Sequence, residues 1–303
     1  MSSPLSLCFL GVGLMGAPMV ERLLKAGFDL SLWNRTATKM DPFSGRAHIA
    51  SSPAQAVAGA DVVITMLENG DIVDQVLYGS GALSHLARGA LVIDMSSIQP
   101  GQARQHASQV KNLGGDYLDA PVSGGTRGAE SGTLSIMAGG EEAAFDRARA
   151  VFEAMGKATH IGPVGSGQLA KLANQAIVGI TIGAVSEALL LAARGGARPD
   201  RVREALLGGF AGSKILEQHG ERMLQRNFTP GAPARIQLKD LRMILDEARA
   251  EGLSLPLSQR VFEQYRGLLA SGHGEVDHSG LLLELERLNG VELESAITDH
   301  EDL

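Results

Sequence analysis

The sequence is poor in the residues on which secreted and disulfide-bonded proteins depend. It contains a single cysteine, Cys8, which excludes an internal disulfide, and the apolar segment around Cys8 favours a buried thiol over a reactive one. Residues 1–4 show neither a basic segment nor a small-residue cleavage site ahead of the first apolar stretch. We therefore expect a protein of a reducing compartment, and specifically of the cytoplasm.

Positive charge, metal-ligand patterns and very long apolar runs are also scarce. The 27 Lys and Arg residues against 34 Asp and Glu residues give a formal net charge of −7, which provides no broad basic surface for nucleic acid. The eight histidines show no metal-ligand spacing and no Ser-His-Asp arrangement. Because we find no apolar run of about 18 or more residues, we also expect no membrane span. A nucleic-acid partner, a metal site and a hydrolase are thereby disfavoured.

The length and the apolar content that are present predict two globular domains. At 303 residues and 44% hydrophobic residues, the chain is longer than most single domains and can bury a substantial core in each of two. We expect a dinucleotide-binding domain at residues 1–163, an interdomain helix at 164–195 and an all-α domain at 196–303.

The first half alternates short apolar strands with helical segments. Near-continuous apolar strands such as Val62-Val63-Ile64 predict a sheet that is covered on both faces. This alternation is typical of a doubly wound α/β domain, a Rossmann fold. The expected strands are residues 5–10, 28–33, 61–67, 90–95, 116–120, 134–138 and 159–161, and the expected helices are 14–25, one that starts at 52–53, and 141–155.

The second half shows helical spacing only. Residues 169–193 form a long stretch rich in alanine, leucine and isoleucine, and a helix that is apolar around most of its circumference must be buried on several sides. The remaining segments contain no clear strand, so the C-terminal domain is predicted to be all-α. Its expected helices are residues 199–207, 213–223, 238–251, 256–270 and 279–288, and the acidic residues 298–303 are expected to be frayed.

A glycine-rich loop connects the first strand to the first helix. A dinucleotide pyrophosphate needs exposed amides at a helix N-terminus, and each glycine there has a reason: the first makes the turn, the second admits the phosphate and the third lets helix and strand approach. A glycine turn without a ligand is the alternative, but the position directly after a strand and before a helix favours the dinucleotide site. The loop is Gly11-Val12-Gly13-Leu14-Met15-Gly16.

The end of the second strand bears on the choice of cofactor. An NAD site usually places an acid about 20 residues past the glycine loop to bind the ribose diol. Here the chain has Asn34, Arg35 and Thr36, with Lys39 nearby, and such residues can receive a 2′-phosphate through charge-assisted hydrogen bonds. We therefore predict a preference for NADPH. A solvated Arg35 in a site that also accepts NADH is the alternative.

A second glycine-rich segment follows a predicted strand end. It runs Asp119-Ala120-Pro121-Val122-Ser123-Gly124-Gly125, and Gly128 and Gly132 beyond it are expected to keep the backbone open. Successive small residues expose amides, so Ser123, Gly124 and Gly125 can hold a carboxylate through their N–H groups and the serine hydroxyl. The alternative is a plain loop without a ligand.

Lys171 and Asn174 lie three residues apart near the start of the long apolar helix, so both side chains share one face. Burial disfavours the ammonium form of a lysine, which suits general acid and base work on an alcohol or carbonyl. The alternative is a lysine whose ammonium reaches solvent along the protein surface. A further pair, Lys239 and Asp240, is expected to open a helix after residues 230–233 and to approach the cleft, or else to form a surface ion pair.

Together these features resemble the β-hydroxyacid dehydrogenases, the family that contains 3-hydroxyisobutyrate dehydrogenase and 2-hydroxy-3-oxopropionate (tartronate semialdehyde) reductase. The likeness covers nearly the whole chain and depends on four motifs in the correct order. These are residues 9–19, residues 119–125 with Gly132-Thr133-Leu134, Gly165-Ser166-Gly167 through Lys171 to Asn174, and Lys239-Asp240-Leu241.

The resemblance implies a role for each candidate residue. Lys171 would be the catalytic acid and base, Asn174 would orient the substrate, and the segment from Ser123 to Gly125 would hold the substrate carboxylate. Lys239 would approach cofactor and substrate, with Asp240 beside it.

The resemblance also implies further cofactor contacts and an assembly. Ser96 or Ser97 would lie near the nicotinamide, and Met66 and Leu67 would line the cofactor. The helical domains of the family usually associate, which implies a homodimer or a homotetramer.

The substrate within the family is predicted from two signals that disagree. Residues 207–213 and 277–279 are similar to tartronate semialdehyde reductases, whereas the ending Asn34-Arg35-Thr36 is more usual in semialdehyde reductases that take NADPH. The leading prediction is a 2-hydroxy-3-oxopropionate reductase, and 3-hydroxyisobutyrate dehydrogenase or another semialdehyde reductase is the alternative.

Three rival interpretations are weaker. For 6-phosphogluconate dehydrogenase the chain is short, and Ala173 stands where that enzyme has a histidine. Imine reductases usually lack the lysine that is Lys171 here. The non-enzyme alternative is a binding protein that senses a dinucleotide.

Overall fold

A computed structural model describes residues 5–294 of the chain. The expectations for residues 1–4 and 298–303 lie outside the described residues. The chain divides into two compact units, one up to Lys171 and one from Leu172 onwards, and each unit is described by itself. The division falls inside a long helix.

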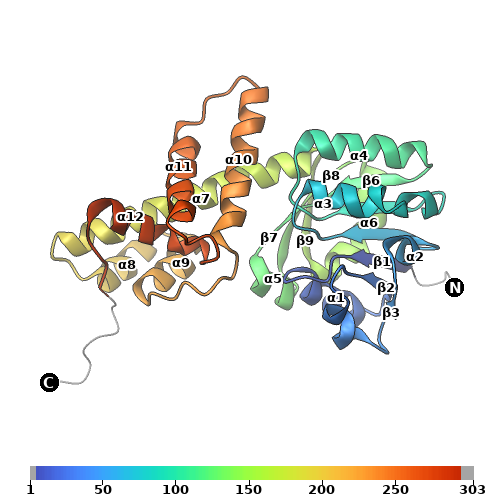
Figure 1. Cartoon of the computed structure of the whole chain (residues 1–303), viewed down its shortest axis with the longest axis horizontal. Helices are drawn as coiled ribbons and strands as arrows, with labels where there is room; N and C mark the ends of the chain where they lie inside the picture. Colours follow the sequence, from blue (N-terminus) through green and yellow to red (C-terminus); the bar gives the residue numbers. More distant parts are fainter. Residues whose placement is uncertain (1–4, 295–303) are drawn as a thin grey trace. The chain divides into compact units, whose positions relative to one another are not determined.

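The first unit is built on a single mixed sheet (Figure 1). Its strand order is β3-β2-β1-β4-β5-β6-β8-β7, with β9 paired to β8. Pairing is parallel from β3 to β6, β8 runs antiparallel to β6 and β7, and β9 runs parallel to β8. The strands are β1 (Ser6–Leu10), β2 (Asp29–Trp33), β3 (His48–Ile49), β4 (Val62–Thr65), β5 (Leu91–Asp94), β6 (Asp116–Asp119), β7 (Val122–Ser123), β8 (Leu134–Gly139) and β9 (Gly156–Gly162).

Helices and short turns connect these strands. The α-helices of the first unit are α1 (Gly16–Lys25), α2 (Pro53–Val57), α3 (Gly70–Asp74), α4 (Pro100–Asn112), α5 (Gly125–Ser131) and α6 (Glu142–Met155). The other connecting segments are two 3₁₀ helices, η1 (Ala37–Phe43) and η3 (Ala82–His85), and one π-helix, η2 (Gln75–Gly79). The predicted Rossmann fold is confirmed, although the short strands β3 and β7 and the helices α3 to α5 were not predicted.

Two hydrophobic clusters cover the two faces of the sheet. Along β1, Leu7 and Phe9 belong to the cluster that packs with α1 and α6, whereas Cys8 and Leu10 belong to the cluster that packs with α4. Alternate residues of a strand point to opposite faces, so both faces are buried, as the apolar strands predicted. The thiol of Cys8 is fully buried, also as predicted.

The second unit is helical, which confirms the predicted fold class. The helix α7 (Ser166–Arg194) begins in the first unit and continues through the second, where Ile182 and Leu189 are fully buried in the helical core. The other helices are α8 (Pro199–Leu207), α9 (Lys214–Leu224), α10 (Ala234–Ala250), α11 (Pro256–Ala270), η4 (His278–Gly280) and α12 (Leu281–Asn289).

The helix α7 corrects two expectations. It is long and apolar enough to cross a membrane by length and composition alone, and 39% of its most apolar window is buried, so a stretch of that kind is present after all. It is also not buried on several sides, because the side chains of Ile177 and Leu191 are 66% and 76% exposed. With Ala173 and Ala184 they lie on one exposed face, since residues four or seven apart share a helix face, and the exposed Glu187 lies beside them.

Two smaller expectations were also wrong. The segment after Gly124 was predicted to be an open loop, but Gly125–Ser131 forms α5, which ends at the left-handed Gly132 (φ 69°). Gly128 instead lets this helix pack closely on Leu134. Lys239 and Asp240 do not open a helix, because α10 already begins at Ala234, directly after Pro233. A proline there interrupts no helical hydrogen bond.

Candidate active site

The glycine loop makes a tight turn between β1 and α1. Gly11 has φ +109°, a conformation that favours glycine, and its N–H donates to the Trp33 carbonyl at 2.9 Å. A Cβ atom on Gly11 would overlap the Met66 carbonyl oxygen, and one on Gly16 would overlap the carbonyl oxygen of Gly11. The first and third glycines are therefore required by close backbone packing.

Gly13 differs from Gly11 and Gly16 in its surroundings. A Cβ atom built there would meet no atom within 4 Å, so the second glycine faces open space. The loop leads directly into α1, where the Ala17 N–H donates to the Gly13 carbonyl at 2.9 Å. Open space beside the loop backbone at a helix N-terminus fits the pyrophosphate of a dinucleotide, and the side chains of Val12, Leu14 and Met15 complete the loop.

The end of β2 lies beside this loop, since Trp33 accepts the Gly11 hydrogen bond. The Asn34 amide donates to the Thr36 carbonyl at 2.9 Å and so fixes the turn after the strand. Arg35 and Lys39 are exposed. Within residues 5–294 no carboxylate is hydrogen-bonded or ion-paired to Arg35, and an arginine of this kind can receive an anionic ligand.

A buried aspartate organises the ends of β4 and β5. Both the Thr65 hydroxyl (2.8 Å) and the Ser96 N–H (2.9 Å) donate to the Asp94 carboxylate, and burial raises the pKa of that carboxyl. The Ser96 hydroxyl in turn accepts the N–H of Leu67 at 3.0 Å. Ser96 is therefore fully buried and joins two loops, whereas Ser97 beside it is half-buried.

Lys171 is buried against the second glycine-rich segment. Its side chain is 9% exposed, and its ammonium donates to the Val122 carbonyl at 2.8 Å. The alternative of an ammonium that reaches solvent is therefore wrong. Ser123 follows Val122 directly and is half-buried, and Gly124 turns the chain with φ +135°. The hydrogen-bond acceptor of the candidate acid Lys171 is thus the residue directly before the candidate carboxylate-binding Ser123.

Two residues that sequence reasoning missed connect Lys171 to the other strand ends. The Asp119 carboxylate accepts the N–H groups of Gly165 at 2.7 Å and Gln168 at 2.8 Å. The Gln168 side chain donates to the Ser96 carbonyl at 2.8 Å and accepts the Ile98 N–H at 3.1 Å. These bonds join the start of α7 to β5 and β6. Their only sequence signal is an acid at the end of an apolar strand.

In the second unit, a network of side-chain hydrogen bonds centres on Gln175, which the sequence did not indicate as a site residue. The Asn174 amide donates to Gln175 at 2.9 Å, and Gln175 donates to the Asp240 carboxylate at 2.6 Å and to Gln237 at 3.3 Å. Lys239 forms an ion pair with Asp240 at 3.2 Å. Because Asp240 is 2% exposed, a simple surface ion pair does not describe Lys239 and Asp240.

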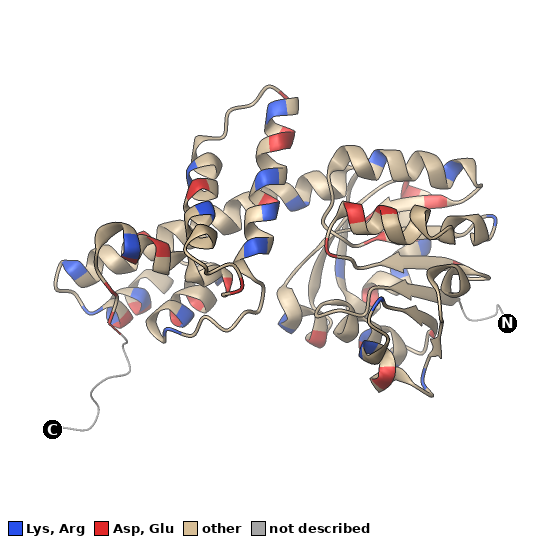
Figure 2. Ribbon diagram, in the orientation of Figure 1, with Lys and Arg blue, Asp and Glu red and all other residues tan. Residues whose placement is uncertain are grey.

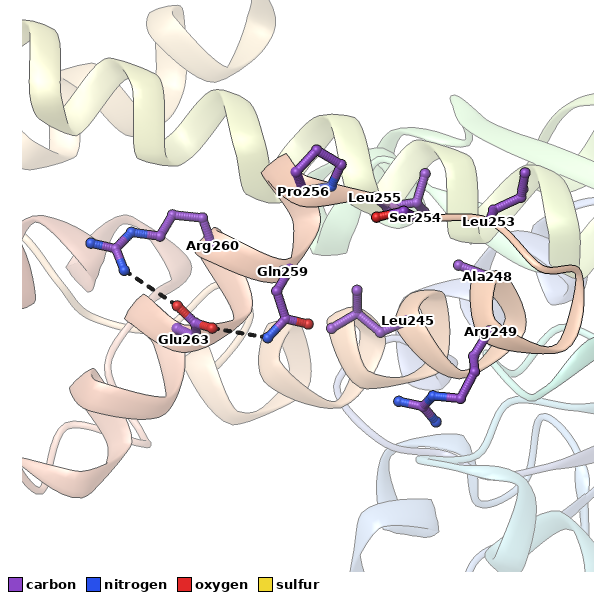
Figure 3. A pocket seen from close by; sticks show the side chains of 10 residues that line it. All are labelled: Leu245, Ala248, Arg249, Leu253, Ser254, Leu255, Pro256, Gln259, Arg260 and Glu263. Carbon is purple, nitrogen blue, oxygen red and sulfur yellow. Dashed lines mark hydrogen bonds and ion pairs between the residues drawn. The ribbon is translucent and has the colours of Figure 1, made fainter.

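The hollow drawn in Figure 3 is a separate feature. It has a volume of about 490 Å³ and lies where α10 ends and α11 begins. None of the candidate site residues lines it. Figure 2 shows acidic and basic residues interspersed in both units, and in the described part of the chain no cluster of three or more potential metal ligands occurs.

Comparisons with known proteins agree with this geometry. Residues 6–165 match the family described as the NAD binding domain of 6-phosphogluconate dehydrogenase, and residues 165–285 match the NAD-binding family of NADP-dependent 3-hydroxyisobutyrate dehydrogenase. The chain is 44% identical to a 2-hydroxy-3-oxopropionate reductase of Escherichia coli over 284 residues, which covers 93% of this chain and 97% of the relative.

Two further relatives cover a similar share. A probable 3-hydroxyisobutyrate dehydrogenase-like 1 protein of Arabidopsis thaliana is 38% identical over 291 residues, covering 95% of this chain and 87% of the relative. The solved 3-hydroxyisobutyrate dehydrogenase of Mycobacterium tuberculosis with L-serine superposes with a TM-score of 0.86 at 31% identity, over 93% of this chain and 99% of that one.

The fold, the glycine loop and these matches define an NAD(P)-dependent oxidoreductase. The chain belongs to the β-hydroxyacid dehydrogenase family.

Proposed function

We propose that this enzyme reversibly reduces a short 3-oxo acid or semialdehyde to its 3-hydroxy acid, with 2-hydroxy-3-oxopropionate as the leading substrate. When bound, the nicotinamide supplies a hydride to the carbonyl carbon. A proton must then reach the carbonyl oxygen. The observation that carries the proposal is a buried lysine, Lys171, whose ammonium donates at 2.8 Å to the carbonyl of Val122, the residue before Ser123.

Lys171 acts as the acid in reduction and as the base in oxidation. Its ammonium gives one proton to the oxygen that becomes the hydroxyl, and the neutral amine takes that proton back in the reverse direction. The hydrogen bond to Val122 fixes the ammonium in place, and a fixed cation also stabilises negative charge that develops on the carbonyl oxygen.

The substrate carboxylate is held by Ser123 together with the N–H groups of Gly124 and Gly125. Gly124 and Gly125 both have positive φ, and a Cβ on Gly125 would meet no atom within 4 Å, which leaves room for a ligand. Anchoring one end of the substrate orients its carbonyl towards Lys171. Asn174 donates its amide hydrogen to Gln175, so its carbonyl oxygen is the group that accepts a substrate hydroxyl.

The cofactor is NADPH in this proposal, with NADH as the alternative. Asn34, Arg35 and Thr36 surround the 2′-phosphate, while Gly11 to Gly16 hold the pyrophosphate. Met66 and Leu67 line the cofactor, and Ser96 or Ser97 lies near the nicotinamide. Lys239, with Asp240 beside it, approaches cofactor and substrate. An exposed arginine in place of an acid at the end of β2 supports the NADPH preference.

The similarity to the Escherichia coli reductase supports the substrate, and the similarity to 3-hydroxyisobutyrate dehydrogenases supports the alternative. A spectrophotometric panel tests both. It comprises tartronate semialdehyde, methylmalonate semialdehyde, succinic semialdehyde, L-serine and L-threonate, each with both cofactors. The proposal expects the highest kcat/KM for tartronate semialdehyde with NADPH. Turnover of none of these compounds would contradict it.

The enzyme is also proposed to be cytoplasmic and to act as a homodimer or homotetramer through its helical unit, without a nucleic-acid or membrane partner. The exposed apolar face of Ala173, Ile177, Ala184 and Leu191 supports the assembly, because exposed apolar patches mark interaction surfaces. Sedimentation of the purified enzyme decides between the assembly and a monomer.

A further inference from the structure

The motif Gly165-Ser166-Gly167 precedes Lys171 but has no part in the function proposed above. It forms the start of α7, and its two glycines are in unusual surroundings. Gly165 has φ +91°, which favours glycine, and its N–H points to the Asp119 carboxylate at 2.7 Å. A Cβ on Gly167 would overlap the backbone oxygens of Met137 and Asp119. The motif therefore brings the helix start directly against the end of β6.

The Asp119 carboxylate is the group that this packing encloses. It is fully buried, and each of its oxygens accepts one amide of the helix start, Oδ1 from Gly165 and Oδ2 from Gln168 at 2.8 Å. A third glycine makes room for it, since a Cβ on Gly139 would lie 2.7 Å from Oδ1. The oxygens of a carboxyl group in this position accept amides that have no acceptor within the helix.

The Gln168 side chain holds the same turn from another direction. It donates to the Ser96 carbonyl and accepts the Ile98 N–H, both beyond the end of β5. The first turn of α7 is thus fixed to β5 and to β6 by four hydrogen bonds. Lys171 comes three residues after Gln168, and its ammonium reaches Val122, three residues after Asp119.

We propose that Asp119 is a positioning residue for catalysis, which together with Gln168 clamps the first turn of α7 so that the Lys171 ammonium is held at the Val122 carbonyl beside Ser123. Asp119 touches no reacting atom and acts through Lys171. The inference rests on the proposed role of Lys171 as acid and base. A displacement of about 1 Å of a catalytic group can cost about a hundredfold in rate, so a clamp of this kind has a measurable effect.

A double-mutant cycle tests this with the full-length enzyme, its reductase activity on tartronate semialdehyde, and NADPH. Asp119→Asn keeps the shape of the side chain but replaces one of its two acceptor oxygens by an NH2 group, which cannot accept an amide of the helix start. The clamp predicts a kcat about 10- to 100-fold lower with little change in KM, and unchanged NADPH affinity. Asp116→Asn is the matched control on the same strand, because Asp116 is partly exposed and forms ion pairs with Lys111 on α4 and Arg147 on α6. It should retain wild-type kcat.

The second arm repeats Asp119→Asn in the Lys171→Ala background, with ethylamine added to rescue turnover. If Asp119 acts only through Lys171, the rescued rate changes by less than about twofold, because residues that act as a unit are not additive. An equal loss in both backgrounds would mean a general structural role and would overturn the inference. Gln168→Ala should likewise lower kcat in the wild-type background and change the rescued rate little in the Lys171→Ala background. If Asp119→Asn does not fold, Gln168→Ala is used in its place.

The two proposals fail in different ways. If Lys171→Ala keeps wild-type turnover, the proposed function is wrong. If Lys171→Ala loses turnover but neither Asp119→Asn nor Gln168→Ala lowers kcat, only the clamp is wrong.

Discussion

The Gln175 side chain donates a hydrogen bond of 2.6 Å to the buried carboxylate of Asp240, and it accepts the amide of Asn174 at 2.9 Å. Gln175 thus connects the buried Asp240 to Asn174, which lies three residues after the proposed catalytic Lys171. This arrangement determines which end of the Asn174 amide is left to accept a hydrogen bond.

Replacing Gln175 by leucine should therefore weaken substrate binding more than chemistry. Without Gln175 the Asn174 amide loses its orientation, and the buried Asp240 loses a hydrogen bond. We expect KM for the acid substrate to rise by about tenfold, the equivalent of a hydrogen bond worth about 1.4 kcal/mol, with NADPH affinity unchanged. Steady-state kinetics check this against Gln259→Leu, whose side chain is exposed on α11. An unchanged KM for Gln175→Leu would show that Asn174 needs no such partner.

Arg35 should determine the cofactor preference. Arg35→Ala removes the guanidinium that would bind a 2′-phosphate, so kcat/KM for NADPH should fall about 10- to 100-fold while that for NADH changes little. The control is Arg201→Ala on α8, where the exposed arginine pairs with Glu204. If both cofactors lose activity equally, Arg35 does not contact the 2′-phosphate.

Two alanine substitutions in the glycine loop should separate its effect on stability from its effect on cofactor binding. Gly16→Ala places a methyl group on the Gly11 carbonyl oxygen and should destabilise the first unit by about 1–3 kcal/mol. Gly13→Ala meets no atom and should leave stability within about 0.5 kcal/mol while weakening NADPH binding. The only tryptophan, Trp33, lies in β2 beside this loop. Its fluorescence therefore reports both urea unfolding of this unit and NADPH titration.

Asp119 should make the first unit less stable as the pH rises. Burial raises the pKa of Asp119 to about 7 from 3.8, against the lowering effect of the Gly165 and Gln168 amides. Between these values the folded state keeps a proton that the unfolded state has released, so stability present below about pH 4 is lost as pH approaches 7. Asp94, paired with Asp119 in the sheet register, is buried with a raised pKa as well.

The comparison of wild type with Asp119→Asn isolates this contribution. The free energy of unfolding of both proteins is measured by Trp33 fluorescence in urea at pH 5, 6 and 7. As the pH rises, that of wild type should fall relative to that of Asp119→Asn by up to about 1.4 kcal/mol per pH unit. Parallel pH profiles for the two proteins would contradict the raised pKa of Asp119.

The sequence predicted the fold well where the signal was local. The apolar strands, the glycine loop and helices such as Pro199–Leu207 have periodicity or turn residues that a short window contains. The helix Gly125–Ser131 was missed because glycine disfavours helix, and packing of Gly128 on Leu134 overrides that preference.

The hydrogen-bonded partners could not be predicted in the same way. Gln168 bonds to Asp119 across 49 positions of the chain, and Gln175 to Asp240 across 65. Such pairs leave no periodic pattern in the sequence, so only the fold reveals them. The exposed face of α7 was mispredicted for a related reason, because composition shows that a helix is apolar but not which side a single chain covers.

Lys171 is proposed to supply the proton. The most direct test is kcat for Lys171→Ala with saturating tartronate semialdehyde and NADPH, together with NADPH affinity from Trp33 fluorescence. We predict a loss of about 10²- to 10⁴-fold in kcat with NADPH affinity unchanged, and partial recovery with ethylamine. A variant that binds NADPH normally and keeps wild-type kcat would contradict the claim.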